Sequence, residues 1–116
     1  LAHLRSDFHF TLSNTDRVGE LIQALHPTPA VCGLPKDEAR QFILANEHHD
    51  RRYYSGFMGP LSLHDTTHLY VTLRCMQLFN SHCRLYAGGG ILPESNEQLE
   101  WQETEAKLDT MRRLFQ

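Results

Sequence analysis

Three consecutive glycines, Gly88, Gly89 and Gly90, constrain this chain more than any other feature. They lie in an apolar run, residues 83–92, that predicts a β-strand, where glycine loses side-chain packing and backbone entropy. Such a run is typical of a backbone that a ligand approaches closely, and its amide groups can then bind an anion. A bulge or a wide turn before the next element explains the glycines equally well.

The clearest helix of the chain follows this run. Ser95 and Gln98 have the spacing of a capping box. On a helical wheel of about 100° per residue, Glu100, Glu103 and Lys107 lie beside the apolar stripe. Carboxylates three residues apart share a face, and Mg²⁺ is typically held by one or two carboxylates with water and substrate oxygens. The pattern therefore predicts a metal and anion site, with a solvated Glu/Lys pair as the common alternative.

The first half of the chain predicts two helices. Residues 7–12 predict a strand, and Thr15 or Asp16 then predicts the start of a helix that ends near Ala24. The prolines within residues 25–35 predict an ordered, extended loop. Pro35, followed by two acidic residues, predicts a second helix to about Glu47.

Three apolar runs, residues 53–63, 68–79 and 83–92, are separated by short turn sequences. This spacing predicts an antiparallel meander. The runs are apolar on both alternations, so we expect both faces of the sheet to be covered. The fold class expected is α+β, an antiparallel sheet with packed helices.

Composition excludes several classes of function. The chain has 116 residues and a net charge of −3, so it is at most one domain and has no basic face for nucleic acid. Its apolar runs are too short to span a membrane. Three cysteines without zinc-type spacing fit reduced thiols and a cytoplasmic protein. Because the chain begins abruptly at Leu1, with no initiator methionine or capping sequence, we expect residues 1–116 to be a single truncated domain.

Several single residues are candidates for chemistry. Arg74 lies within the most apolar predicted strand, where an arginine needs a planar anionic partner, most often a structural carboxylate. Tyr54 is typical of a core residue. None of the eight histidines has the spacing of a zinc site. His3 and His26 are the two that lie close to elements able to face a pocket.

The motifs together resemble one family. In chain order they are LHPTPAVCGLP at residues 25–35, Glu47-x₃-Arg51-x₂-Tyr54-x-Gly56, Leu73-Arg74, RLYAGGGI at residues 84–91 and EWQETEAKL at residues 100–108. They resemble the C-terminal half of the chorismate-utilising enzymes over essentially the whole chain. The HPTPA loop is similar to that of the isochorismate synthases of menaquinone and siderophore pathways.

The resemblance implies a fold and a reaction. The fold is an α+β sandwich in which large antiparallel sheets enclose the active site, and the reaction is Mg²⁺-dependent isomerisation of chorismate to isochorismate. It implies that Glu103 binds Mg²⁺, with Glu100 beside the ion holding its waters. The ion bridges to the ring carboxylate of chorismate, and Lys107 lies near that end of the ligand.

The resemblance also assigns the remaining site residues. Arg74, Tyr54 and the backbone amide of Gly88 resemble the clamp for the enolpyruvyl carboxylate. His3 matches the active-site histidine of the family and is the catalytic candidate. Ala30 matches the pocket position that helps to distinguish water from ammonia as the nucleophile.

This chain departs from the family pattern in three ways. The general base, a lysine, and the general acid, a glutamate, belong to the preceding half of the family's sequence, as does another metal glutamate. Lys36 and Lys107 are the only lysines here, and neither matches the base, so we expect the isolated chain to be inactive. Gly89 stands where the family usually has alanine, and Arg52 stands where glycine is usual.

Two other hypotheses remain open. One is a salicylate- or anthranilate-type chorismate enzyme, which the proline loop disfavours. The other is a non-catalytic domain that binds an anionic ligand or a protein partner. In either case, apolar strands exposed by truncation favour self-association.

Overall fold

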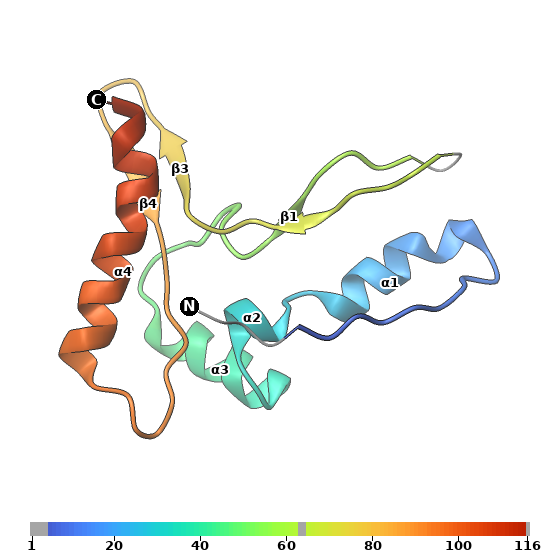
Figure 1. Cartoon of the computed structure of the whole chain (residues 1–116), viewed down its shortest axis with the longest axis horizontal. Coiled ribbons are helices and arrows are strands. Elements are labelled where there is room, and N and C mark those ends of the chain that lie inside the picture. The colour runs from blue at the N-terminus through green and yellow to red at the C-terminus, as the bar shows by residue number, and fades with distance from the viewer. Residues whose placement is uncertain (1–4, 63–64, 116) are drawn as a thin grey trace.

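The computed structural model describes residues 5–62 and 65–115. Helices and short antiparallel strands occur in the same chain, so the predicted α+β class is confirmed (Figure 1). The helices are α1 (Val18–Leu25), α2 (Pro29–Cys32), α3 (Lys36–Asn46) and α4 (Glu97–Arg112). The strands are β1 (Phe57–Met58), β2 (Tyr70–Val71), β3 (Cys75–Leu78) and β4 (Cys83–Tyr86).

The two helices predicted in the first half are confirmed. A 3-10 turn, Thr15–Arg17, leads into α1, and the Asn14 side chain accepts a hydrogen bond from the Asp16 amide at 2.9 Å. The cap is therefore Asn14 and not Thr15 or Asp16. Helix α3 begins after Pro35, and its first turn is acidic, which suits the positive end of the helix dipole.

The proline loop contains one helical turn, so the prediction of a wholly extended loop was wrong. Pro29 occupies the start of α2, where a missing amide hydrogen costs nothing and the fixed φ favours the helix. Thr28 remains extended, as expected before proline. Gly33 ends the turn with a φ of 101°, a conformation that glycine adopts readily.

The strands form two hairpins instead of one meander. β1 pairs with β2, and β3 pairs with β4, both antiparallel. Residues 68–79 do not form one strand, because Arg74 has a φ of 42° and bends the chain between β2 and β3. Figure 1 shows the β1 hairpin projecting away from α4. Residues 7–12 form no strand, since no strand of the described chain pairs with them.

Helix α4 lies alongside β4 (Figure 1). The Asn96 side chain accepts a hydrogen bond from the Leu99 amide at 3.1 Å and caps the helix. The capping box predicted at Ser95 was therefore wrong by one residue. The acidic first turn, Glu97 and Glu100, again favours the helix N-terminus.

The described chain buries little of its apolar surface. Its buried side chains are Cys32, Ser55 and Tyr86, so the prediction that both sheet faces are covered was wrong. The accessible surface is 10183 Å², against about 6,500 Å² for a compact protein of this mass. The radius of gyration is 16.6 Å, against about 13 Å for a compact domain. No helix in the described ranges is long and apolar enough to cross a bilayer.

Candidate functional site

The glycine-rich segment lies directly against α4. A methyl carbon added at Gly89 would lie 3.4 Å from Glu100 Oε2, 3.8 Å from Thr104 Cγ2 and 3.9 Å from Lys107 Nζ. Two of the three charged residues that the helical wheel placed together, Glu100 and Lys107, therefore face this backbone. The glycines predicted close approach of a ligand to this backbone; in the structure, it is helix α4 that approaches it.

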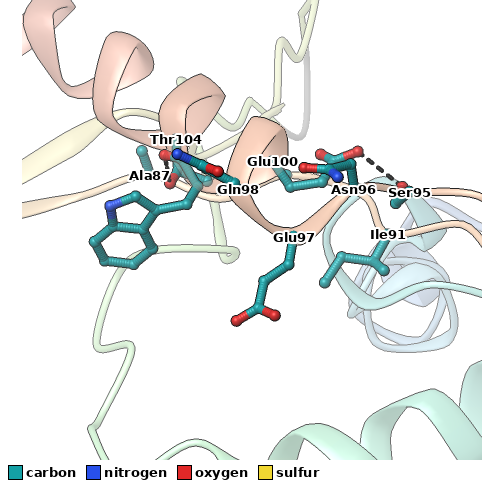
Figure 2. Close-up of a pocket in the computed structure, with 10 residues that line it drawn as sticks. Ala87, Ile91, Ser95, Asn96, Glu97, Gln98, Glu100 and Thr104 are labelled. Atoms are coloured by element: carbon teal, nitrogen blue, oxygen red, sulfur yellow. Dashed lines mark hydrogen bonds between the residues drawn. The ribbon is translucent and has the colours of Figure 1, made fainter.

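Glu100 is held by the turn that precedes its helix. Ser95 Oγ donates to Glu100 Oε1 at 2.8 Å and accepts from the Leu92 amide at 3.0 Å. Figure 2 shows the Glu100 carboxylate turned toward Ser95. Ser95 thus orients a carboxylate instead of capping the helix, and Glu100 Oε2 remains directed toward the Gly89 backbone.

Lys107 joins Glu103 to the glycine-rich segment. Its Nζ lies 2.5 Å from Glu103 Oε1, and it donates to the Gly88 carbonyl at 3.2 Å. The pKa of Glu103 lies below its ordinary value of 4.5, because Lys107 donates a hydrogen bond to it and adds its positive charge. Glu103 is accordingly ionised at neutral pH, as a metal ligand must be.

A groove runs between this segment and the start of α4 (Figure 2). Its volume is about 920 Å³, large enough for a small organic molecule. Glu100 and Glu97 bring negative charge to it, whereas Ile91 and Trp101 contribute apolar surface. The groove therefore offers an oxygen-rich helix start beside an apolar wall.

Tyr54, in the turn before β1, also contacts the glycine-rich segment. Its hydroxyl lies so close to Gly88 that a methyl carbon there would be 2.4 Å away. The Tyr54 ring stacks on Tyr86 with centroids 5.9 Å apart and planes 18° apart. Burial raises the pKa of Tyr54 above 10.0, and the charge of Arg51 opposes this shift. The hydroxyl consequently stays protonated and able to donate.

Comparison with known proteins identifies the family. The chorismate binding enzyme family matches residues 1–116. The chain belongs to this family. The isochorismate synthase DhbC of Bacillus subtilis (strain 168) is 46% identical over 94 residues, which cover 81% of this chain and 24% of DhbC.

Two Escherichia coli (strain K12) relatives match nearly the whole chain. The isochorismate synthase MenF is 43% identical over 114 residues, covering 98% of this chain and 26% of MenF. The isochorismate synthase EntC is 37% identical over 115 residues, covering 99% of this chain and 29% of EntC. The chain thus spans about a quarter of the length of the curated relatives it matches. No solved structure matches it.

The remaining chorismate-family positions are more scattered. Arg74 lies at the bend between β2 and β3, where its side chain is exposed and its Nη1 is 3.5 Å from Thr110 Oγ1. The prediction that Arg74 lies within a strand was therefore wrong. Its contact residue Thr110 lies one turn beyond Lys107 on α4. Ala30 is exposed in α2 and is not among the residues that line the groove. His3 lies outside the described residues.

The carboxylates fit part of the ligand set that Mg²⁺ requires. Glu100 and Glu103 are one turn apart on α4; Glu100 faces the Gly89 backbone, and Glu103 is connected to the glycine-rich segment through Lys107. The described part of the chain contains no group of three or more His, Cys, Asp or Glu side chains arranged to hold a metal ion. One or two carboxylates are sufficient where water and substrate oxygens complete the coordination of Mg²⁺.

Sequence reasoning missed two contributors to this site. Ser95 was assigned to the helix cap, and its contact with Glu100 has no distinctive sequence signal. Arg51 was quoted only as part of a motif, yet it contacts Tyr54 and several other segments. The spacing of four residues between Glu47 and Arg51 was the available signal for an ion pair.

Proposed function

We propose that this chain is the C-terminal portion of an isochorismate synthase and binds the charged groups of chorismate. The observation that carries the proposal is the packing of the Glu100 and Lys107 side of α4 on the Gly88–Gly89 backbone. Support also comes from the relatives DhbC, EntC and MenF, each of which is named isochorismate synthase. In the complete protein, we propose that the chain forms part of an α+β sandwich.

In this proposal, α4 binds the ring-carboxylate end of chorismate. Glu103 would hold Mg²⁺, and Glu100, whose Oε1 accepts from Ser95, would bind the water around it. The ion supplies positive charge that neutralises the ring carboxylate. Lys107, which bridges Glu103 and the Gly88 carbonyl, keeps the α4 carboxylates and the glycine segment in fixed relation.

The enolpyruvyl carboxylate is assigned to Tyr54, Arg74 and the Gly88 amide. The protonated Tyr54 hydroxyl abuts Gly88, so both can donate to one carboxylate. Arg74 is exposed, and among the described residues its side chain makes only a long contact with Thr110, at 3.5 Å. A guanidinium held this weakly is free to turn toward an anionic ligand.

The reaction proposed is the addition of water at one ring carbon of chorismate as the 4-hydroxyl leaves. It requires a base that takes a proton from water and an acid that protonates the departing oxygen. Lys36 donates to the Ala24 carbonyl at 2.8 Å, and Lys107 is engaged at α4, so neither serves as the base. We therefore propose that base and acid come from the remainder of the protein, with His3 as a further active-site residue and Ala30 beside the water.

The isolated chain is accordingly proposed to lack turnover. Its exposed apolar side chains, such as Phe8, Phe42 and Leu78, are proposed to be covered by the rest of the protein or, in its absence, by self-association. Isochorismate made by the complete protein would enter menaquinone or siderophore biosynthesis.

The experiment that tests this function is product analysis by chromatography. The full-length protein that contains this chain is incubated with chorismate and Mg²⁺, with the separately expressed 116 residues as the comparison. We expect isochorismate from the full-length protein and none from the isolated chain. Anthranilate or salicylate as the sole product would assign a different chorismate reaction, and unchanged chorismate would reject the enzyme function.

A further inference from the structure

Arg51 connects its near neighbours Glu47 and Ser55, each four positions away, to Val31, twenty positions earlier in the sequence. Its Nε donates to Glu47 Oε2 at 2.6 Å, at the end of α3, and its Nη2 donates to Glu47 Oε1. Its Nη1 donates to the Val31 carbonyl at 3.0 Å and to Ser55 Oγ at 2.9 Å. One guanidinium thus binds α2, the end of α3 and the turn that carries Tyr54.

The fork geometry explains why this residue is arginine. The guanidinium presents five donors in a rigid plane, so it binds a carboxylate on one edge and still has donors for other acceptors. A lysine ammonium is a compact charge and cannot span Glu47 and Val31 in the same way. The Arg51 side chain is 23% exposed and that of Glu47 is 30% exposed, so solvent screens the pair only partly.

The turn that Arg51 contacts is strongly constrained. Ser55 is buried and has a φ of 70°, a conformation that a non-glycine residue adopts only when its surroundings hold it. The Ser55 amide donates to the carbonyl of Thr72, the residue after β2, at 2.9 Å. This hydrogen bond ties the turn to the β1–β2 hairpin. The Arg51 guanidinium carbon also lies 5.7 Å from the centre of the Tyr54 ring.

We propose that Arg51 is a positioning residue that holds Tyr54 against Gly88 and ties the α2 loop to the turn that carries Tyr54. This inference rests on the proposed function and deepens it. Val31 follows Ala30, the pocket position proposed to lie beside the attacking water, and Ser55 follows Tyr54, which is assigned to the enolpyruvyl carboxylate. Arg51 therefore couples the water end of the site to the carboxylate end without touching the substrate.

Arg52 provides the matched comparison. Arg52 is the next residue, but its side chain is 61% exposed, and its Nε lies 3.1 Å from Asp50. Arg52→Gln therefore removes an arginine of the same turn without touching the tether. Arg51→Gln removes the tether, and Arg51→Lys keeps the positive charge but loses the fork, which covers the case in which Arg51→Gln does not fold.

Cys32 reports on the loop independently of substrate. It is buried, follows Val31 directly, and its thiol lies 3.7 Å from the Lys36 carbonyl. Cys83 is exposed and serves as the internal reference. Pulse alkylation of the full-length protein, followed by peptide mass spectrometry, measures how often the loop opens.

The test combines alkylation with kinetics on the full-length protein. For Arg51→Gln and Arg51→Lys we expect about a tenfold rise in KM for chorismate, with a smaller change in kcat. We also expect about a tenfold rise in Cys32 labelling relative to Cys83. Arg52→Gln should change neither.

Each of the other outcomes overturns the proposal. Faster Cys32 labelling with unchanged KM means that Arg51 stabilises the fold without positioning the site. A raised KM without faster labelling means that the loop is not held by Arg51. If the wild-type protein does not convert chorismate, the proposed function fails, while unchanged Cys32 labelling would separately refute the tether.

Discussion

The Tyr54 hydroxyl lies where a side chain on Gly88 would begin, 2.4 Å from the position of an added methyl carbon. The two residues are 34 positions apart: Tyr54 precedes β1, and Gly88 follows β4. Tyr54 cannot withdraw freely, because it stacks on Tyr86 and contacts Arg51. Glycine at position 88 is therefore required by a side chain and not by its own backbone conformation.

Gly88→Ala should consequently displace Tyr54. Overpacking of this kind costs about 1–3 kcal/mol, and a displaced ligand group should raise KM for chorismate roughly tenfold or more. Gly90→Ala is the matched control, since no atom of residues 5–62 or 65–115 lies within 4 Å of a methyl carbon added there. Steady-state kinetics on both full-length variants check the prediction, and equal effects at positions 88 and 90 would refute it.

Gly89→Ala should stabilise the protein, whereas Gly88→Ala should destabilise it. A methyl carbon at Gly89 meets Glu100, Thr104 and Lys107 at 3.4–3.9 Å, which is ordinary contact. Alanine also reduces the freedom of the unfolded chain, so we expect stabilisation of about 0.4–1 kcal/mol. Thermal unfolding of the full-length protein measures this, and a lower Tm than the wild type would contradict the contact geometry. Alanine is also the residue that the family resemblance places at this position.

The Glu47–Arg51 ion pair should make stability depend on pH. The hydrogen bond from Arg51 holds the pKa of Glu47 below its ordinary value of 4.5. Because the folded-state pKa is the lower one, the contribution is complete above about pH 4.5 and is lost as the pH falls through the folded-state pKa. Glu47→Gln should lower the free energy of unfolding by about 1–2 kcal/mol at pH 7, which is less than the loss on breaking a fully buried ion pair. The loss should become smaller as the pH falls.

Tm measured against pH for the wild type and Glu47→Gln tests this prediction. Glu20→Gln is the comparison, because Glu20 forms an exposed ion pair with Arg17 at 2.8 Å that contributes less than about 1 kcal/mol. A constant difference in Tm between Glu47→Gln and the wild type from pH 7 to pH 3 would show that the charge of Glu47 is not responsible.

The helices were predictable because their signals are local. Acidic first turns, apolar spacing and proline at a helix start act within a few residues, and α1 and α3 were predicted to within about two residues at each end. The N-cap of α4 was predicted one residue too early. The exact cap was harder, because Ser95 and Asn96 are both good N-caps. Only the geometry of the turn decides that Asn96 caps and that Ser95 binds Glu100.

The strands were less predictable because pairing is not local. An apolar run such as residues 68–79 shows β propensity but not where it changes partner. Arg74, with its positive φ, breaks the run into two strands in separate sheets. Residues 7–12 have the same composition as a strand, yet a strand exists only where another strand pairs with it.

For the candidate site, the helical face was predictable and the long-range contacts were not. The spacing of Glu100, Glu103 and Lys107 on α4 follows from the 3.6-residue period. The contact of Tyr54 with Gly88 and the tether through Arg51 depend on how hairpins and loops meet, which no local pattern specifies.

The most direct test of the account is the Mg²⁺ dependence of chorismate binding to the full-length protein, measured by titration calorimetry for the wild type, Glu103→Gln and Asp109→Asn. Asp109 is the matched control, an exposed carboxylate of α4 that pairs with Arg112 at 3.0 Å. The account predicts that Mg²⁺ strengthens binding at least about tenfold, a coupling of about 1.4 kcal/mol, in the wild type and Asp109→Asn but not in Glu103→Gln. Equal enhancement by Mg²⁺ in all three proteins would contradict it.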